Sequence, residues 1–489
     1  MNILAIDQGT SATKALLVGP GNEVLGRAEV PVATTAVDGD GVEADPEELW
    51  NSVVSAGAQA LAAARAPAHV PVHAVALANQ GETVLAWDKA SGRPLSRAIV
   101  WQDRRSAGIC ERLEPCASDL QAITGLPLDP YFAAPKMKWL RENVTAGGVI
   151  TTTDSWLLHR LGTEYVTDAA TASRTMLLDL DAVRWSDPAC AAFGIAPEAL
   201  PRVAGCAEVV GETTAFTDRA LPIAAIAVDQ QAALFAHGCV RAGDAKCTYG
   251  TGAFLLVTTG EKAARSSAGL SASVAWRLHD STTYCLDGQV YTAGSALRWL
   301  TEIGVLPRPA DLDPVAGAVK DSGGVTFVPA LAGLGAPHWA PQAKGQLTGL
   351  TLATNKGHIA RAVAEGIAAS VAVLAAAVAA DLGRPLTALR VDGGLTRSRV
   401  LLQAQADLLQ VPVLVSRTPD ATALGVAALA RRALGEAAQS EAAQSEAAQC
   451  EAAGSPPAEV ELIVHPVMTA AQSAERMAGY HRALTSCLS

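Results

Sequence analysis

Short apolar runs alternate with longer amphipathic stretches along this chain, starting at the N-terminus. Residues 4–7 and 15–18 are apolar runs that predict two strands joined by a tight polar turn. Residues 45–64 predict a helix, because they open on Asp45-Pro46-Glu47-Glu48, a capping acid followed by proline and acids. Further strands are expected at 72–78, 84–88 and 99–102. Strands that alternate with helices predict an α/β layered fold.

The second half of the chain repeats this pattern from about Gly243. Strands flank Gly250-Thr251-Gly252, and a turn at Gly288-Gln289 is expected to separate strands at 283–287 and 290–291. Helices are expected at 295–302, 358–380 and 422–434, and strands at 388–392 and 411–416, with the last helix closing the unit. We therefore predict two domains, residues 1–240 and 241–489, whose boundary lies near 238–243.

Each half opens with a hairpin turn that is rich in glycine and hydroxyl residues. The first turn is Asp7-Gln8-Gly9-Thr10-Ser11, followed by Lys14, and the second is Thr248-Tyr249-Gly250-Thr251-Gly252. Backbone N–H groups and hydroxyls in such turns can bind an anion, although turn hydroxyls more often bond their own backbone. A single turn of this kind is usually an ordinary hairpin. The pair indicates two lobes that close on a phosphate chain.

Composition narrows the classes of partner. The 489 residues carry a formal net charge of −11 without a Lys/Arg cluster, which argues against nucleic acid or an anionic membrane as partner. Nine cysteines without metal-site spacing indicate reduced thiols. The most apolar segment, 366–380, is too short to span a bilayer and is interpreted as a buried helix. Because no secretory leader pattern is present, we expect a soluble cytoplasmic protein.

One low-complexity segment stands apart from the alternating pattern. Residues 436–457 repeat Glu-Ala-Ala-Gln-Ser with a period of five and end on Gly454-Ser455-Pro456-Pro457. A five-residue period presents no fixed apolar face on a helix. We interpret the segment as a solvent-exposed insertion, helical or disordered, that carries no chemistry.

Several residues could carry chemistry, and each also has a structural interpretation. Asp7 could hold Mg²⁺ through water or could cap its turn. Asp229 opens a helix after an apolar run, so it could be a general base or an N-cap. Gly393-Gly394 could bind an adenosine or simply form a tight strand–helix turn. Glu82, Trp101 and Tyr131 are types that line a polyol or sugar pocket, although each alone is more often structural.

Taken in order, these segments resemble the FGGY carbohydrate kinases, and within them the glycerol kinases most. The resemblance runs from residue 3 to about 430. The matching segments include Asp7-Gln8-Gly9-Thr10, Asn79-Gln80-Gly81-Glu82-Thr83, Val100-Trp101-Gln102-Asp103-Arg104-Arg105, Asp129-Pro130-Tyr131-Phe132, Asp229-Gln230-Gln231-Ala232-Ala233, Thr248-Tyr249-Gly250-Thr251-Gly252 and Asp392-Gly393-Gly394. It implies two ribonuclease-H-like lobes, as in actin and Hsp70 ATPases, with the active site in the cleft between them.

The resemblance also implies a reaction and a set of roles. The reaction is transfer of the γ-phosphate of ATP, with Mg²⁺, to a hydroxyl of a small polyol or sugar. Asp229 would be the general base and Asp7 would lie near the metal. The nucleotide would meet Thr10, Ser11, Lys14, Gly250, Thr251, Gly393 and Gly394. The acceptor would meet Glu82, Trp101, Tyr131, Asp229, Gln230 and Phe254. By analogy, the protein would form a homo-oligomer, a dimer or a tetramer.

Departures from the family pattern leave the acceptor open. Glycerol kinases have arginine where this chain has Gly81, and that arginine donates hydrogen bonds to glycerol. Its loss weakens the fit to glycerol, and the vacated volume could admit a four- or five-carbon polyol or a ketopentose. Ala133, where Pro, Ser or Thr is usual, carries little weight. Two other interpretations are an actin-like nucleotide switch and an inactive homologue that binds a metabolite. The acceptor set with Asp229 argues against the first, and the complete set of candidate site residues against the second.

Overall fold

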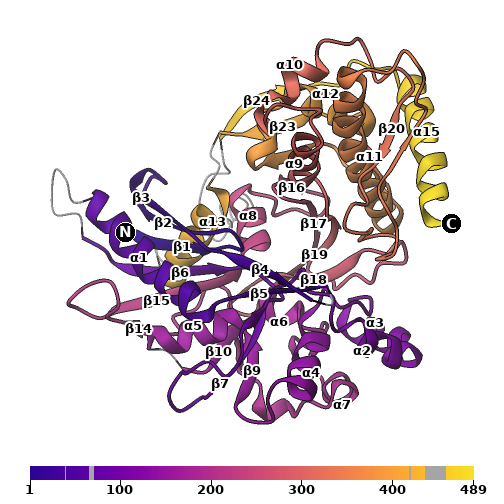
Figure 1. Cartoon of the computed structure of the whole chain (residues 1–489). Helices are drawn as coiled ribbons and strands as arrows, with labels where there is room; N and C mark the ends of the chain where they lie inside the picture. The colour runs from indigo at the N-terminus through magenta and orange to yellow at the C-terminus, as the bar shows by residue number, and fades with distance from the viewer. Residues whose placement is uncertain (39, 65–70, 163, 418–419, 436–458) are drawn as a thin grey trace.

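The computed structural model describes residues 1–489 except 39, 65–70, 163, 418–419 and 436–458. The predicted Glu-Ala-Ala-Gln-Ser insertion therefore lies outside the described residues. Two large sheets form the centres of two lobes (Figure 1), and a smaller five-stranded sheet extends the first lobe. Its strands, in spatial order, are β4 (Thr34–Val37), β5 (Gly41–Ala44), β8 (Ala98–Ile99), β7 (Val84–Trp87) and β9 (Val149–Thr152).

The first lobe is built on a six-stranded sheet. Its spatial order is β14 (Gly211–Thr213), β15 (Leu221–Val228), β6 (Ala74–Asn79), β1 (Ile3–Gln8), β2 (Ala12–Val18) and β3 (Val24–Pro31). β1, β2 and β3 are antiparallel neighbours, whereas β6 and β15 run parallel to β1. β1 is apolar on both faces because both are covered: Leu4 and Ile6 pack with α1 (Pro46–Ala64), and Ile3 and Ala5 with the opposite layer.

The second lobe repeats this arrangement in a seven-stranded sheet. Its spatial order is β18 (Ser271–Leu278), β19 (Ser281–Val290), β17 (Ala253–Gly260), β16 (Ala245–Tyr249), β22 (Leu389–Asp392), β23 (Val413–Ser416) and β24 (Val460–Val464). β19, β17 and β16 are antiparallel, and β22 and β23 continue in parallel from β16. Both lobes are thus ribonuclease-H-like, as predicted.

One predicted turn is wrong. No turn interrupts the described chain at Gly288-Gln289, because both residues lie inside the single strand β19. A Cβ at position 288 would lie 2.6 Å from Cδ2 of Leu374, on the helix that covers the sheet. The glycine is therefore needed for close helix–sheet packing and not for a change of chain direction.

That covering helix is α11 (Lys356–Leu382), the longest in the second lobe (Figure 1). It is 27 residues long and apolar enough to cross a membrane, but 67% of its most apolar window is buried inside the lobe. It contains the segment 366–380, which was predicted from the sequence to be a buried helix. In the lobe it contacts α9 (Gly294–Glu302), α10 (Leu312–Ala316), α12 (Arg399–Leu409), α15 (Ala470–Leu488) and β20 (Thr326–Val328). β20 in turn pairs with β21 (Gln346–Thr348).

The helix expected to close the second unit instead returns to the first lobe. α13 (Ala421–Ala433) packs against α8 (Asp229–Ala236) and against β1, β6 and β15, as Figure 1 shows. Its apolar residues Val426 and Leu429 share a core with Ile3 and Ala5. The remaining helices of the first lobe are α2 (Ala107–Leu113), α3 (Ala117–Thr124), α4 (Ala133–Asn143), α5 (Thr153–Leu161), α6 (Ala169–Ser173) and α7 (Asp187–Phe193), and its short strands are β10 (Val166–Asp168), β11 (Leu178–Asp179), β12 (Arg184–Trp185) and β13 (Arg202–Ala204).

Candidate active site

A cavity of about 300 Å³ lies between the two lobes and draws its lining from both. Ten residues expected from the sequence line it together: Thr10, Ser11, Glu82, Trp101, Tyr131, Asp229, Gln230, Gly250, Thr251 and Phe254. The two glycine-rich turns reach it from corresponding places, since each joins the two antiparallel strands beside the parallel part of its sheet. The parallel strands β6 and β15 end at the same edge, which brings Glu82 and Asp229 to the cavity.

The first turn is tied to the acceptor side of the cavity through the hydroxyl of Thr10. This hydroxyl donates to Oε1 of Gln80 at 3.0 Å and accepts a hydrogen bond from the indole Nε1 of Trp101 at 2.9 Å. Because Thr10 engages the indole N–H, Trp101 offers its ring to a ligand. That ring meets Tyr131 and Phe254 edge-on, with centroids 5.8 and 5.9 Å apart, so the three rings form an aromatic wall.

Asp229 is the first residue of α8 and is half-buried. Its Oδ1 accepts a hydrogen bond from the backbone N–H of Gln230 at 2.7 Å. Burial raises the pKa of Asp229 above its usual range, and the nearby Lys246 ammonium opposes that rise. A carboxylate with a raised pKa, open to a cavity, is suited to take a proton from a hydroxyl.

Lys246 fixes the orientation of Gln230. Its fully buried ammonium donates to Oε1 of Gln230 at 2.6 Å and to the hydroxyl of Thr248 at 2.9 Å. The amide nitrogen of Gln230 therefore remains as the donor for a ligand in the cavity. Lys246 was not predicted as a site residue, because a lysine in a strand before a glycine turn has no distinguishing pattern.

Arg174 and Asp287 were also missed. Arg174 lines the cavity and donates from Nε to Oε1 of Glu82 and from Nη1 to Oδ1 of Asp287, both at 2.6 Å. Burial raises the pKa of Glu82, and Arg174 opposes the rise. Glu82 itself has a φ of 59°, which is uncommon for a residue other than glycine. The signal that could have revealed Arg174 is that it is the only charged residue in the segment 169–178.

Asp7 and Lys14 stand at the back of the first turn and do not line this cavity. They are register partners on β1 and β2. Asp7 has no hydrogen-bond donor among the described residues, and burial together with the nearby Asp229 carboxylate raises its pKa to about 7. An oxygen ligand in an excess of negative charge suits Mg²⁺, which keeps most of its waters and needs few protein ligands. No group of three metal-binding side chains occurs in the described part of the chain.

A second cavity of about 500 Å³ adjoins the first and shares Gly250, Thr251 and Arg298 with it. Gly394 lines this second cavity, with the apolar Leu297 and Leu395. Gly393 does not, but its φ of 94° and the closeness of the Tyr249 carbonyl leave no room for a Cβ. The two cavities therefore meet at the second turn, as a nucleotide with its phosphates toward the acceptor would require.

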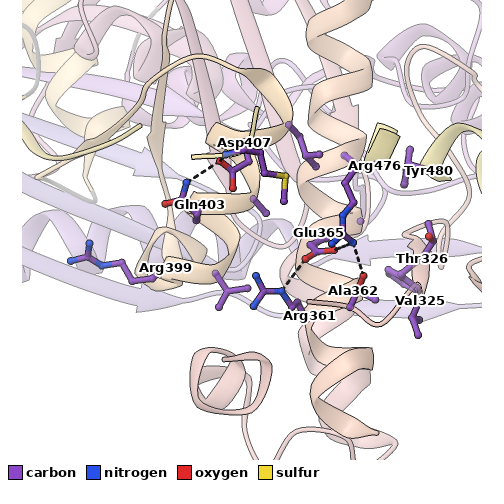
Figure 2. A pocket seen from close by; sticks show the side chains of 18 of the residues that line it. Val325, Thr326, Arg361, Ala362, Glu365, Arg399, Gln403, Asp407, Arg476 and Tyr480 are labelled. Carbon is purple, nitrogen blue, oxygen red and sulfur yellow. Dashed lines mark hydrogen bonds and ion pairs between the residues drawn. The ribbon is translucent and has the colours of Figure 1, made fainter. Parts of the chain in front are cut away.

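A third cavity of about 490 Å³, shown in Figure 2, lies inside the second lobe between α11, α12 and α15. Its charged groups are largely engaged with one another. Glu365 pairs with Nε of Arg361 at 3.0 Å and with Nη1 of Arg476 at 3.5 Å. Asp407 accepts from the backbone N–H groups of Val467 and Met468. With its carboxylates satisfied, this cavity is a poorer candidate for catalysis than the inter-lobe one.

Comparisons with known proteins agree with this geometry. Residues 2–236 match the N-terminal domain, and residues 245–434 the C-terminal domain, of the FGGY family of carbohydrate kinases. The chain is 42% identical to a glycerol kinase of Myxococcus xanthus, covering 87% of this chain and 89% of the relative. It is 43% identical to a glycerol kinase of Thermus brockianus, covering 87% and 88%.

Solved structures of kinases share the two-lobed fold of this chain. A Plasmodium falciparum glycerol kinase with ADP superposes with a TM-score of 0.89 at 28% identity, covering 100% of this chain and 98% of that one. A xylulose kinase of Lactobacillus acidophilus, at 22% identity, shares the fold with a TM-score of 0.85, covering 100% and 99%.

Two ribonuclease-H-like lobes, with glycine-rich turns that face a shared cavity containing an acid and an aromatic wall, define a two-lobed phosphotransferase. The domain matches and the relatives narrow this class further. The chain belongs to the FGGY family of carbohydrate kinases.

Proposed function

We propose that the protein transfers the γ-phosphate of ATP to a hydroxyl of a small polyol, with Asp229 as the general base. The observation that carries the proposal is the position of Asp229. Its carboxylate opens onto the cavity that also contains both glycine-rich turns and the aromatic wall. The curated relatives named above are glycerol kinases, which supports a polyol as the acceptor class.

Each group in the cavity then has a task. The acceptor's carbon chain lies against Trp101, Tyr131 and Phe254, while Glu82 accepts and Gln230 donates hydrogen bonds to its hydroxyls. Asp229 takes the proton of the attacking hydroxyl as the oxygen approaches the γ-phosphorus. The turns at Thr10-Ser11 and Gly250-Thr251 hold the phosphates, with Lys14 contributing positive charge behind the first. Lobe closure excludes water, which competes as an acceptor.

ATP and Mg²⁺ are the cofactors of this proposal. The adenosine would occupy the second cavity along Gly394, with Gly393 keeping the backbone close. Asp7 would hold Mg²⁺ through a bound water, and the ion would neutralise phosphate charge during transfer. Burial, together with the nearby Asp229 carboxylate, raises the pKa of Asp7, and a divalent cation at this place would favour its charged form.

Glycerol is the first acceptor to test, and a longer polyol is the second candidate. Position 81 carries no side chain that could donate to glycerol, which favours the longer acceptor. The space there is only partly free, since a Cβ on Gly81 would lie 2.9 Å from Cγ2 of Val228. Both residues line the cavity, so Val228 occupies part of the volume that a side chain at position 81 would need.

The experiment is an ADP-release assay with Mg-ATP and a panel of glycerol, erythritol, threitol, arabitol, xylitol, xylulose and ribulose. Turnover of glycerol at low KM means that other donors replace the missing arginine. A strong preference for a four- or five-carbon compound means that Gly81 and Val228 define a different pocket. Absence of turnover with every acceptor, from a protein that still binds ATP, contradicts the proposal and favours an inactive homologue or a nucleotide switch.

Two further expectations from the sequence belong with this function. A cytoplasmic location fits an enzyme that uses ATP, and cell fractionation tests it. A homo-oligomer, dimer or tetramer, is expected by analogy. Light scattering on the eluted protein measures its mass, and a monomer would contradict that expectation.

A further inference from the structure

One buried guanidinium connects the two lobes beneath the acceptor cavity. Arg174 follows α6, and only 4% of its side chain is exposed. It holds Glu82, which follows β6 in the first lobe, and Asp287, which lies on β19 in the second, each at 2.6 Å. The two carboxylates are themselves almost fully buried. A single side chain therefore bridges segments that belong to different sheets.

The surroundings of Arg174 keep it in one place. Its guanidinium carbon lies 5.7 Å from the ring centre of Tyr131 and 5.2 Å from that of Phe132. The second oxygen of Asp287 accepts from Nε2 of Gln289 at 3.1 Å. Buried ion pairs often add little to stability compared with apolar residues of similar size. The arrangement is therefore better explained by what it positions than by stability.

What it positions is Glu82. This residue has a left-handed backbone conformation, with a φ of 59°, which persists only where surrounding contacts hold it. One carboxylate oxygen is held by Arg174, and the residue lines the cavity. A planar guanidinium can hold two carboxylates at once through separate nitrogens, which an ammonium on a flexible chain does poorly.

We propose that Arg174 is a positioning residue that sets Glu82 to receive an acceptor hydroxyl and holds it in place from Asp287 of the second lobe. This rests on the proposed function, because it assumes that a polyol occupies the cavity. It assigns no chemical step to Arg174. Loss of Arg174 should weaken acceptor binding strongly and nucleotide binding little, because Arg174 does not line the nucleotide cavity.

The test begins with acceptor KM, ATP KM and kcat for Arg174→Lys, using the acceptor that the panel identifies. Loss of charged hydrogen bonds predicts an acceptor KM raised by about tenfold to a hundredfold, with ATP KM changed by less than about threefold. The matched control is Arg202→Lys, because Arg202 also pairs with two carboxylates, those of Glu164 and Glu208, but on the surface. That variant is expected to behave as the wild type.

A chemical rescue separates positioning from a purely structural role. Arg174→Ala leaves a space that opens to the cavity, and millimolar guanidinium chloride, but not sodium chloride, is expected to restore much of the acceptor affinity. In the Arg174→Ala background, Glu82→Gln should add little to acceptor KM, because Glu82 is already misplaced. Melting temperature and ATP binding show whether each variant folds.

Two results overturn the proposal. One is an unchanged acceptor KM in Arg174→Lys. The other is fully additive effects of Arg174→Ala and Glu82→Gln without guanidinium rescue in folded protein. Both are read only after the wild type is shown to phosphorylate an acceptor. A wild type without acceptor turnover instead contradicts the proposed function.

Discussion

Each lobe has an aspartate near the end of one of its central strands, but the two acids have different hydrogen-bond partners. Asp392, at the end of β22, lies 2.6 Å from Nε2 of His237. Burial alone would raise its pKa, yet the bond and charge of His237 lower it below the usual range. Asp7, at the end of β1, has no hydrogen-bond donor among the described residues, and its pKa rises to about 7. The carboxylate of Asp392 is thus compensated by His237, whereas that of Asp7 accepts no hydrogen bond among the described residues.

The two glycine-rich turns also differ in the groups that they present to the cavities. The first, around Thr10 and Ser11, presents hydroxyl side chains and is bonded to Trp101 of the acceptor wall. The second, Gly250-Thr251-Gly252, presents mostly backbone, which lies between the acceptor cavity and the larger second cavity. The same sheet pattern, present in both lobes, thus carries two kinds of turn. We infer that the first lobe supplies the acceptor chemistry and the second supplies room for the nucleotide.

The largest expected effect is on Asp229. Asp229→Asn keeps the shape and the bond from Gln230 but cannot accept a proton. We expect kcat to fall by about 10² to 10⁴-fold or more, the usual contribution of general acid–base catalysis. Melting temperature and ATP affinity should change little. A variant that keeps most of its kcat would show that another group is the base.

The next prediction concerns the compensated acid. Asp392→Asn weakens a charge-assisted bond to the buried His237, so we expect unfolding to become easier by about 1.5–3 kcal/mol. The measurement is urea unfolding at pH 7, with Asp7→Asn as the comparison. Asp7→Asn removes a carboxylate that accepts no hydrogen bond among the described residues and whose pKa is raised, so it should not destabilise the metal-free protein. Equal destabilisation by both changes would remove the distinction between the two acids.

The pH dependence of Mg²⁺ binding should further distinguish Asp7 from Asp392. A folded-state pKa of about 7 means that the metal-free native protein holds a proton on Asp7 that the unfolded chain releases. Stability from this group therefore falls as pH rises from about 4 to 7. A cation that requires the carboxylate binds more tightly over the same rise, by up to about tenfold per pH unit below the pKa. Calorimetric titration with Mg²⁺ at pH 6 and 8 measures this, and Asp7→Asn should abolish the difference.

The smallest expected effect is at the wall formed by Gly81 and Val228. Gly81→Ala places a Cβ 2.9 Å from Cγ2 of Val228, which must shift. We expect the acceptor KM to rise by roughly threefold, about 0.6 kcal/mol. Val228→Ala in the same chain should restore it by removing that methyl group. If the double variant is no better than Gly81→Ala alone, the two positions do not share one wall.

Much of the fold was predictable from local pattern. The turns after β1 and β16 and the core strands and helices follow from apolar runs, glycines and capping residues close together in sequence. The sequence also placed ten cavity residues in one expected site. The prediction of a turn at Gly288-Gln289 was wrong because the glycine allows close packing against Leu374, which lies far along the chain.

What only the tertiary structure decided were the long-range pairings. α13 lies on the first sheet although its residues follow the second, because its apolar face completes the core around Ile3 and Ala5. Arg174 gains meaning only when Glu82 and Asp287 meet it from two sheets. Asp7 and Asp392 resemble each other in sequence, since each ends an apolar run before a glycine turn. The bond to His237 is the main feature that distinguishes Asp392 in the fold. Local sequence sets the elements because backbone preferences and amphipathic periodicity act over a few residues. The compensation of buried charge depends on which distant groups the fold brings within hydrogen-bond distance.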